Sequence, residues 1–172
     1  VAHLHADGDA VGSITGMAAL LRQVSSAKVT PMLPNGCPDE FDGVPGAGVI
    51  ANATTDTEAC LRSIAEADLI VVLDLNAFDR TGPLADALQQ CSAKRMLIDP
   101  HLAPRLDNFD LAVSEPDISS TCELVYWLMS TTFGLEIFTA EAATSLYTGI
   151  CTDTGTFSYS NDRTSLYLAT AS

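Results

Sequence analysis

Five consecutive apolar residues, Leu69–Leu73, constrain the fold more than any other part of the sequence. An uninterrupted run of large aliphatic residues is typical of a central strand in a parallel sheet, because helices cover both faces of such a sheet. A helical pattern precedes the run at residues 57–67. After the run, Thr81-Gly82-Pro83 opens another predicted helix, with Pro83 suited to its first position. The pattern predicts an α/β fold around this strand.

Strands and helices alternate along the rest of the chain as well. Val1 and Ala2 resemble the end of a strand, and Val11, Ile14 and Leu21 then recur at helical spacing. The other predicted strands cover residues 28–33, 95–98 and 109–113, and the other predicted helices cover 121–132, 140–150 and 165–172. The chain therefore belongs to the α/β class, with a mostly parallel β-sheet flanked by helices.

Composition excludes several classes of protein. A chain of 172 residues, almost half of them apolar, is long enough for one well-cored globular domain. Its formal net charge of −14 argues against binding to long duplex nucleic acid, which needs Lys and Arg to neutralise phosphates. No apolar run reaches the roughly 20 residues of a membrane span, and no signal peptide is visible. We therefore expect a cytoplasmic protein that does not enter a membrane.

The five cysteines indicate a reducing environment. They are odd in number and widely spaced, and no two of them form a C-x-x-C pair. This pattern predicts free thiols and excludes a disulfide framework or a zinc ribbon.

Acidic residues and histidines recur where predicted elements end. They follow three predicted strands and one helix: His3, Asp7 and Asp9, then Asp74, then Asp99 and His101, and finally Asp153. In parallel sheets, the carboxyl ends of the strands are where ligands bind. An aspartate that closes an apolar run is costly to bury unless it is paired or bound to a cation, and few Lys or Arg lie nearby in sequence. The spacing therefore favours a divalent cation, for which imidazole and carboxylate oxygens are ligands.

Two glycine-containing segments bear on the predicted structure, one in the first predicted helix and one in a predicted loop. Gly12 and Gly16 are expected to let the first helix lie close to the sheet.

The segment Gly46-Ala47-Gly48-Val49-Ile50-Ala51 nearly matches a dinucleotide-binding fingerprint, but it lies in a loop rich in Pro and Gly at residues 34–52. Because that fingerprint must follow a strand directly, the loop interpretation is favoured and no nucleotide cofactor is predicted.

Taken in order, the motifs resemble those of the DHH phosphoesterase superfamily over nearly the whole chain. The first is His3-Leu4-His5-Ala6-Asp7-Gly8-Asp9, and the second runs from Val71-Val72-Leu73-Asp74 to Asp79-Arg80-Thr81-Gly82. The third is Leu97-Ile98-Asp99-Pro100-His101, and the fourth is Gly149-Ile150-Cys151-Thr152-Asp153-Thr154-Gly155. Within the superfamily the chain is most similar to small bacterial enzymes that hydrolyse oligoribonucleotides, phosphoadenosine phosphate or cyclic dinucleotides.

The resemblance implies a catalytic site with two Mn²⁺ ions, although Mg²⁺ or another divalent metal also suits such ligands. By similarity, His3, Asp7 and Asp74 hold one ion, while Asp9, Asp74 and Asp153 hold the other, with Asp74 bridging. Two metals about 3.5–4 Å apart can activate a bridging hydroxide for in-line attack on phosphorus. His101 is then expected to contact the phosphate or supply a proton.

Some residue roles have two interpretations. Asp99 is either a metal ligand or, as the resemblance favours, a residue that orients its neighbours. Arg80 either contacts substrate phosphate or pairs with Asp79. His5 is not expected to be a ligand, because it points away if His3 points into the site.

The chain departs from the family pattern at two places. Pro100 stands where the family has a histidine that, by similarity, binds the second metal, so we expect that site to be weak. The family also has a smaller C-terminal substrate-binding domain, and this sequence stops before one. We therefore interpret residues 1–172 as the catalytic domain of a longer protein.

Two functions are consistent with the sequence. The first is a metal-dependent phosphodiesterase or phosphatase that acts on small nucleotides or short single-stranded RNA. The second is a phosphate-ester-binding or regulatory module whose catalysis is impaired at Pro100. A homodimer is compatible with either function.

Overall fold

All strands of the structure pair in parallel. The computed structural model describes residues 1–101, 104–159 and 162–171, and within these residues two sheets form. In the smaller sheet β1 (Met32–Leu33) pairs with β2 (Ala51–Asn52). In the larger sheet the order is β3 (Leu69–Leu73), β4 (Lys94–Ile98) and β5 (Leu111–Val113). The predicted α/β class with a parallel sheet is confirmed.

The apolar run forms β3 as predicted, but its position in the sheet differs from the prediction. Among the described strands β4, not β3, lies in the centre of the larger sheet. On the other side of β3 the chain start pairs with it: the Val1 amino group donates to the Val71 carbonyl oxygen, and Leu73 N donates to the Val1 oxygen, both at 2.9 Å. Leu69 is 52% exposed, so β3 is buried on both faces only toward its carboxyl end.

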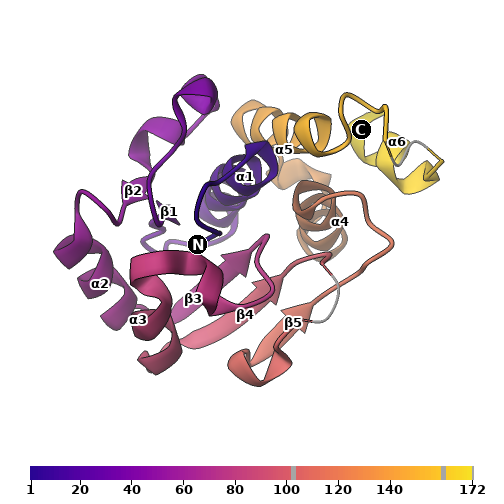
Figure 1. The fold of residues 1–172 in the computed structure, drawn as a ribbon. Coiled ribbons are helices and arrows are strands. Elements are labelled where there is room, and N and C mark those ends of the chain that lie inside the picture. The colour runs from indigo at the N-terminus through magenta and orange to yellow at the C-terminus, as the bar shows by residue number, and fades with distance from the viewer. Residues whose placement is uncertain (102–103, 160–161, 172) are drawn as a thin grey trace.

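Helices cover both faces of the larger sheet (Figure 1). One layer holds α1 (Gly8–Val24), α4 (Thr121–Phe133) and α5 (Ala140–Asp153), and the opposite layer holds α2 (Thr57–Ala65) and α3 (Ala85–Gln90). Side chains of the strands alternate between the layers. Leu73 and Ile98 pack in the core under α1, α4 and α5, whereas Val72 and Leu97 pack in the core with α2 and α3. The last helix, α6 (Thr164–Ala171), contacts α4.

Several predicted boundaries are wrong. The strand predicted at residues 28–33 is reduced to Met32–Leu33. The helical turn predicted to open at Thr81-Gly82-Pro83 is present: Gly82, with φ of 53°, interrupts the 3₁₀ segment Phe78–Leu84, and Pro83 and Leu84 lead from this break into α3, which begins at Ala85. The helix predicted to end at Ile150 continues through Asp153.

The segment with the dinucleotide fingerprint forms no phosphate-binding turn. It contains the 3₁₀ segment Ala47–Val49 and leads into β2, without a helix. Further 3₁₀ segments cover Asp39–Phe41, Leu106–Asn108 and Leu135–Ile137. All five cysteines are free, as predicted. None of the helices within the described residues combines the length and the hydropathy that crossing a bilayer requires.

The glycines of α1 face α5 rather than the sheet, which corrects the prediction. A Cβ atom on Gly12 would lie 2.5 Å from the Ser145 carbonyl oxygen, and one on Gly16 would lie 2.6 Å from the Leu146 side chain. The helix pair α1 and α5 accordingly makes the most extensive contact between any two elements of the described structure. The absence of side chains at these positions lets the two helix backbones approach closely.

Replacing Gly12 with alanine should therefore destabilise the domain. Because the added methyl group meets a backbone oxygen, which cannot rotate away, the helices must separate, at a cost of about 1–3 kcal/mol. Urea unfolding measures the change. The matched control is Gly48→Ala, since a Cβ there has nothing within 4 Å; we expect its effect to stay within about 0.5 kcal/mol. Equal effects of the two substitutions would contradict the packing argument.

Candidate metal centre

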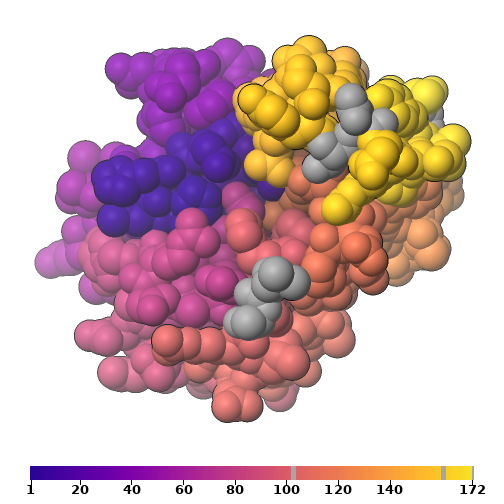
Figure 2. Space-filling view, turned by 45° about the vertical axis from the view of Figure 1, so that its right-hand side comes forward, coloured from indigo at the N-terminus to yellow at the C-terminus, as the bar shows by residue number. Residues whose placement is uncertain are grey.

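The carboxyl ends of β3 and β4 open into one polar pocket of about 250 Å³. Its lining contains most of the predicted site residues together with their neighbours: His3, Asp7, Asp9, Asp74, Arg80, Pro100, His101, Ile118, Ser119 and Asp153. Figure 2 shows the indigo N-terminal segment beside the pink segments that follow β3 and β4, with the orange and yellow helices α5 and α6 above them. The structure thus brings together residues that are as much as 150 positions apart, from His3 to Asp153.

Asp74 lies at the centre of the site. It follows β3 directly, adopts a left-handed backbone with φ of 56°, and is only 3% exposed. Its Oδ2 atom lies 3.2 Å from His3 Nε2, and its Oδ1 atom accepts a hydrogen bond of 3.0 Å from the Thr121 hydroxyl. Burial by itself raises the pKa of Asp74, but the hydrogen bond and charge of His3 outweigh burial and hold that pKa below its usual value.

His3 is oriented by the backbone of its own segment. Its Nδ1 atom donates to the Leu4 carbonyl oxygen at 2.9 Å, so Nε2 is the nitrogen that faces Asp74. The hydrogen bond to Asp74 raises the pKa of His3. An imidazole fixed in this way by a carbonyl group is the usual arrangement of a metal-binding histidine. His5, two residues on, is exposed and binds Asn35 through its backbone, so it lies outside the pocket, as predicted.

Asp7 and Asp9 are positioned by two helix N-termini. Asp7 caps α1, and its Oδ1 atom accepts hydrogen bonds from the amides of Asp9 and Ala10. Asp9 is buried and points to the start of α4, where its two carboxylate oxygens accept from Thr121 N at 2.7 Å and Cys122 N at 2.9 Å. Both arrangements place a carboxylate at the positive end of a helix.

Burial and crowding shift the pKa values of two carboxylates upward. Burial, followed by the negative charge of Asp74, raises the pKa of Asp9 to about 8, although hydrogen bonds from Cys122 act in the opposite direction. Desolvation and the charges of Asp74 and Asp7 raise the pKa of Asp153 to about 6. Desolvation and the neighbouring negative charges thus both favour the protonated form of these two carboxyl groups.

The segment after β4 places a second histidine beside Asp74. His101 Nδ1 lies 2.6 Å from Asp99 Oδ1 and 3.7 Å from Asp74 Oδ1. Its hydrogen bond to Asp99 raises the pKa of His101. Asp99 is fully buried and does not line the pocket, while Pro100 lines it without offering a donor atom. Asp99 therefore lies behind the lining of the pocket, in contact with His101.

The donor atoms fit a divalent cation. One ligand atom each from His3, Asp7 and Asp74 lies within 4.8 Å of the others, and the same holds for Asp74, Asp99 and His101. Such mixed imidazole and carboxylate sets suit Mn²⁺, Zn²⁺ or Fe²⁺. The buried oxygen Asp99 Oδ2 has no hydrogen-bond partner in the described structure, which is a further sign that a cation or water belongs here. Neither group contains Asp9 or Asp153.

Arg80 lines the same pocket and brings a positive charge to it. Its neighbour Asp79 is within 3.9 Å of Arg105 instead, across a different hollow. This arrangement favours the interpretation of Arg80 as a phosphate contact over that of an Asp79 partner.

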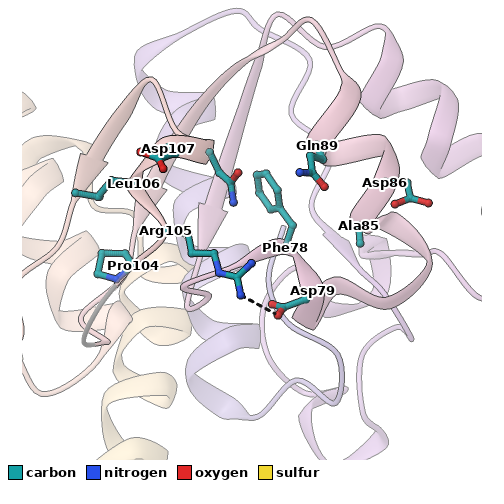
Figure 3. A pocket seen from close by; sticks show the side chains of 10 residues that line it. Phe78, Asp79, Ala85, Asp86, Gln89, Pro104, Arg105, Leu106 and Asp107 are labelled. Atoms are coloured by element: carbon teal, nitrogen blue, oxygen red, sulfur yellow. Dashed lines mark ion pairs between the residues drawn. The ribbon is translucent and has the colours of Figure 1, made fainter.

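The other hollow is larger, about 570 Å³, but its lining contains no imidazole or thiol group that could bind a metal or act as a nucleophile (Figure 3). Phe78 points into it, and the exposed side chains of Asp79 and Arg105 face each other at its edge. No histidine or cysteine lines it. The smaller pocket is therefore the candidate site despite its size.

Sequence reasoning did not foresee the role of α4. Thr121 holds Asp74 through its hydroxyl and Asp9 through its amide, across 47 and 112 residues respectively. The available signal was the predicted cap Ser119-Ser120-Thr121, since a helix start after a strand of the same sheet presents free amides at the ligand-binding edge. Ser120 is indeed the cap, and its side chain accepts from Glu123 N.

Comparison with known proteins agrees with this geometry. Residues 1–150 match the model of the DHH family, N-terminal domain. The crystal structure of an exopolyphosphatase-related protein from Bacteroides fragilis is similar, with a TM-score of 0.95 and 34% sequence identity over 99% of this chain and 49% of that chain. This chain therefore spans about half the length of that protein. With four motifs in order, their acidic residues and histidines in one pocket and a family match over most of its length, the chain belongs to the DHH family.

Proposed function

We propose that this chain is the catalytic domain of a metal-dependent phosphoesterase that hydrolyses small nucleotides or short single-stranded RNA. The single observation that carries the proposal is the convergence of His3, Asp7, Asp9, Asp74 and Asp153 on one pocket at the carboxyl edge of a parallel sheet. Family membership supports the phosphoester chemistry. The nucleotide body of the substrate is the part of the proposal that rests on the resemblance of the motifs alone.

His3, Asp7 and Asp74 would hold one cation, and Asp74 would share in a second. When bound, divalent cations polarise the phosphoryl group and lower the pKa of water. Mn²⁺ fits the mixture of imidazole and carboxylate, and Mg²⁺ fits the carboxylates. The chain's own contribution to binding is to hold these donors in place from separate elements before the substrate arrives.

The remaining residues act on the phosphate. Arg80 lines the pocket and can neutralise a phosphate oxygen, which an otherwise acidic pocket would repel. Asp99 holds His101 by a hydrogen bond of 2.6 Å, and this hydrogen bond raises the pKa of His101. His101 can donate a hydrogen bond to a phosphate oxygen or to the leaving oxygen while the bond from phosphorus breaks.

A specific feature supports a second candidate function. Pro100 lines the pocket at the position where the family supplies an imidazole, so the chain could bind phosphate esters with little turnover. The related structure from Bacteroides fragilis is named for exopolyphosphatase, and this adds inorganic polyphosphate to the substrates worth testing.

The metal-free domain should lose stability as the pH rises, and Mn²⁺ should restore it. Asp9, Asp153, His3 and His101 all have raised pKa values in the folded state, so the folded protein binds more protons than the unfolded chain. For the two carboxyl groups that contribution is complete only below the unfolded value of 3.8, so part of it is already lost at pH 5.5, and the loss continues toward pH 8 as the pH passes the folded values of about 6 and about 8.

Calorimetry in EDTA and in Mn²⁺ measures this effect. We expect the Tm in EDTA to fall between pH 5.5 and pH 8, and the increase caused by Mn²⁺ to be larger at pH 8, because the cation then displaces fewer protons. If Mn²⁺ raised the Tm by the same amount at both pH values, the claim that Mn²⁺ displaces protons from these residues would be wrong.

The proposed activity is tested with Asp74→Asn in the full-length protein. Hydrolysis of short RNA, phosphoadenosine phosphate, cyclic dinucleotides and polyphosphate is measured with Mn²⁺. We expect kcat/KM to fall more than about 100-fold for the preferred substrate. Substituting a residue that only hydrogen-bonds to a metal ligand already lowers metal affinity or activity about 10- to 100-fold, and Asp74 is proposed to bind the metal itself. The control Asp39→Asn changes an exposed carboxylate away from the pocket and should leave the rate unchanged. Hydrolysis that survives Asp74→Asn would refute the proposal.

The impaired-module alternative is tested with Pro100→His. A histidine there adds an imidazole to the pocket wall, and we expect phosphodiesterase activity to rise if the missing imidazole limits the reaction. An unaltered protein that binds Mn²⁺ but hydrolyses none of the substrates, together with an active Pro100→His variant, would favour the binding module. An active unaltered protein would exclude it.

A further inference from the structure

Among the described residues, Asp99 is the buried carboxylate with an oxygen that has no hydrogen-bond partner. The residue follows β4 directly and is 0% exposed. Its Oδ1 atom is paired with His101 Nδ1 at 2.6 Å, but its Oδ2 atom has no hydrogen-bond partner among the described residues. A buried carboxylate oxygen without a partner is expensive, so such an atom signals a missing ion or water.

Two further donors lie beside this carboxylate. His101 Nδ1 is 3.7 Å from Asp74 Oδ1, and one ligand atom each of Asp74, Asp99 and His101 lies within 4.8 Å of the others. Ligands of a divalent cation bind at about 2.0–2.6 Å, so two atoms that share one cation are separated by at most about twice that distance. The three side chains therefore meet the spacing that one cation requires.

The family resemblance implies that Asp9, Asp74 and Asp153 bind the second cation, but the ligand atoms of these three residues do not all lie within 4.8 Å of one another. Asp9 has both carboxylate oxygens engaged, one by Thr121 N and the other by Cys122 N. Neither Asp9 nor Asp153 belongs to a group of three donors within 4.8 Å among the described residues. Among the described residues, Asp99 and His101 are the donors that form a second group of three with Asp74, apart from the group with His3 and Asp7.

We propose that Asp74, Asp99 and His101 hold the second cation, and that His101 supplies the imidazole that Pro100 cannot. The inference rests on the proposed function, because Asp74 is shared with the first cation site. Binding of the cation at Nδ1 would release to solvent the proton that His101 shares with Asp99, and would free Asp99 Oδ1 as well. The other ring nitrogen keeps its proton and remains available to a phosphate oxygen.

The test compares Asp99→Asn and His101→Gln with Asp153→Asn in the full-length protein. Calorimetric titration with Mn²⁺ gives the number of ions and their Kd values. We expect two ions in the unaltered protein, and a second Kd raised at least about 10-fold in Asp99→Asn and in His101→Gln, with the first Kd unchanged. Asp153→Asn is expected to keep both ions. Two ions of unaltered affinity in either Asp99→Asn or His101→Gln, or a single ion in the unaltered protein, would overturn the assignment.

A spectroscopic measurement separates ligation from positioning. Pulsed EPR counts the imidazole nitrogens coupled to bound Mn²⁺, and we expect two in the unaltered protein and one in His101→Gln. One nitrogen in the unaltered protein would overturn the role of His101. Because Asp99 is buried, thermal unfolding in EDTA checks that Asp99→Asn folds; His101, with a side chain 48% exposed, provides a variant that leaves the core unchanged.

Hydrolysis assays on the same preparations keep the two proposals apart. Two ions in the unaltered protein, a second ion weakened in both variants as expected and no hydrolysis of any substrate would together refute the proposed function and leave the cation assignment in place. Hydrolysis that continues while Asp99→Asn retains two ions would refute the cation assignment alone.

Discussion

The buried carboxylate of Asp74 is the interaction on which the arrangement of the site depends. It receives His3 from the N-terminal segment, Thr121 from the start of α4 and the approach of His101 from the segment after β4. A left-handed backbone at a residue other than glycine costs about 1–3 kcal/mol, and it persists only where the surroundings hold it. Here the hydrogen bonds to the Asp74 side chain stabilise this left-handed backbone. The same contacts position the N-terminal segment, the start of α4 and the segment after β4.

The electrostatics of the pocket follow from the same crowding. Asp74 stays ionised because histidines lie beside it, whereas Asp9 and Asp153 hold protons more tightly than isolated carboxyl groups do. The negative charge is therefore most favourable on the carboxylate that has histidine partners, and it is less favourable on Asp9 and Asp153. Carboxylates whose pKa values are pushed apart in one pocket are a sign of function, since a merely structural fold would gain from replacing them with neutral residues.

The sequence predicted the parts of this site that depend on local pattern. The apolar run Leu69–Leu73 and the aspartate after it have one physical interpretation, and β3 has the predicted bounds. Contacts between distant elements could not be predicted in this way. Which helix the glycines of α1 face, and that α4 amides bind Asp9 across more than a hundred residues, follow from how helices pack once the sheet has formed. The unpaired oxygen of Asp99 is likewise a property of the packed structure.

The packing that excludes side chains also sets the position of the site. A Cβ on Gly149 would lie 2.2 Å from Cys122 Sγ and 3.1 Å from the Asp9 backbone, so α5 can approach α1 and α4 only because this residue is glycine. Asp9 lies at the start of α1, and Asp153 ends α5. The separation of these two carboxylates is therefore fixed by contacts between glycines and backbone atoms outside the pocket. The geometry of the pocket thus depends on small residues that lie outside it.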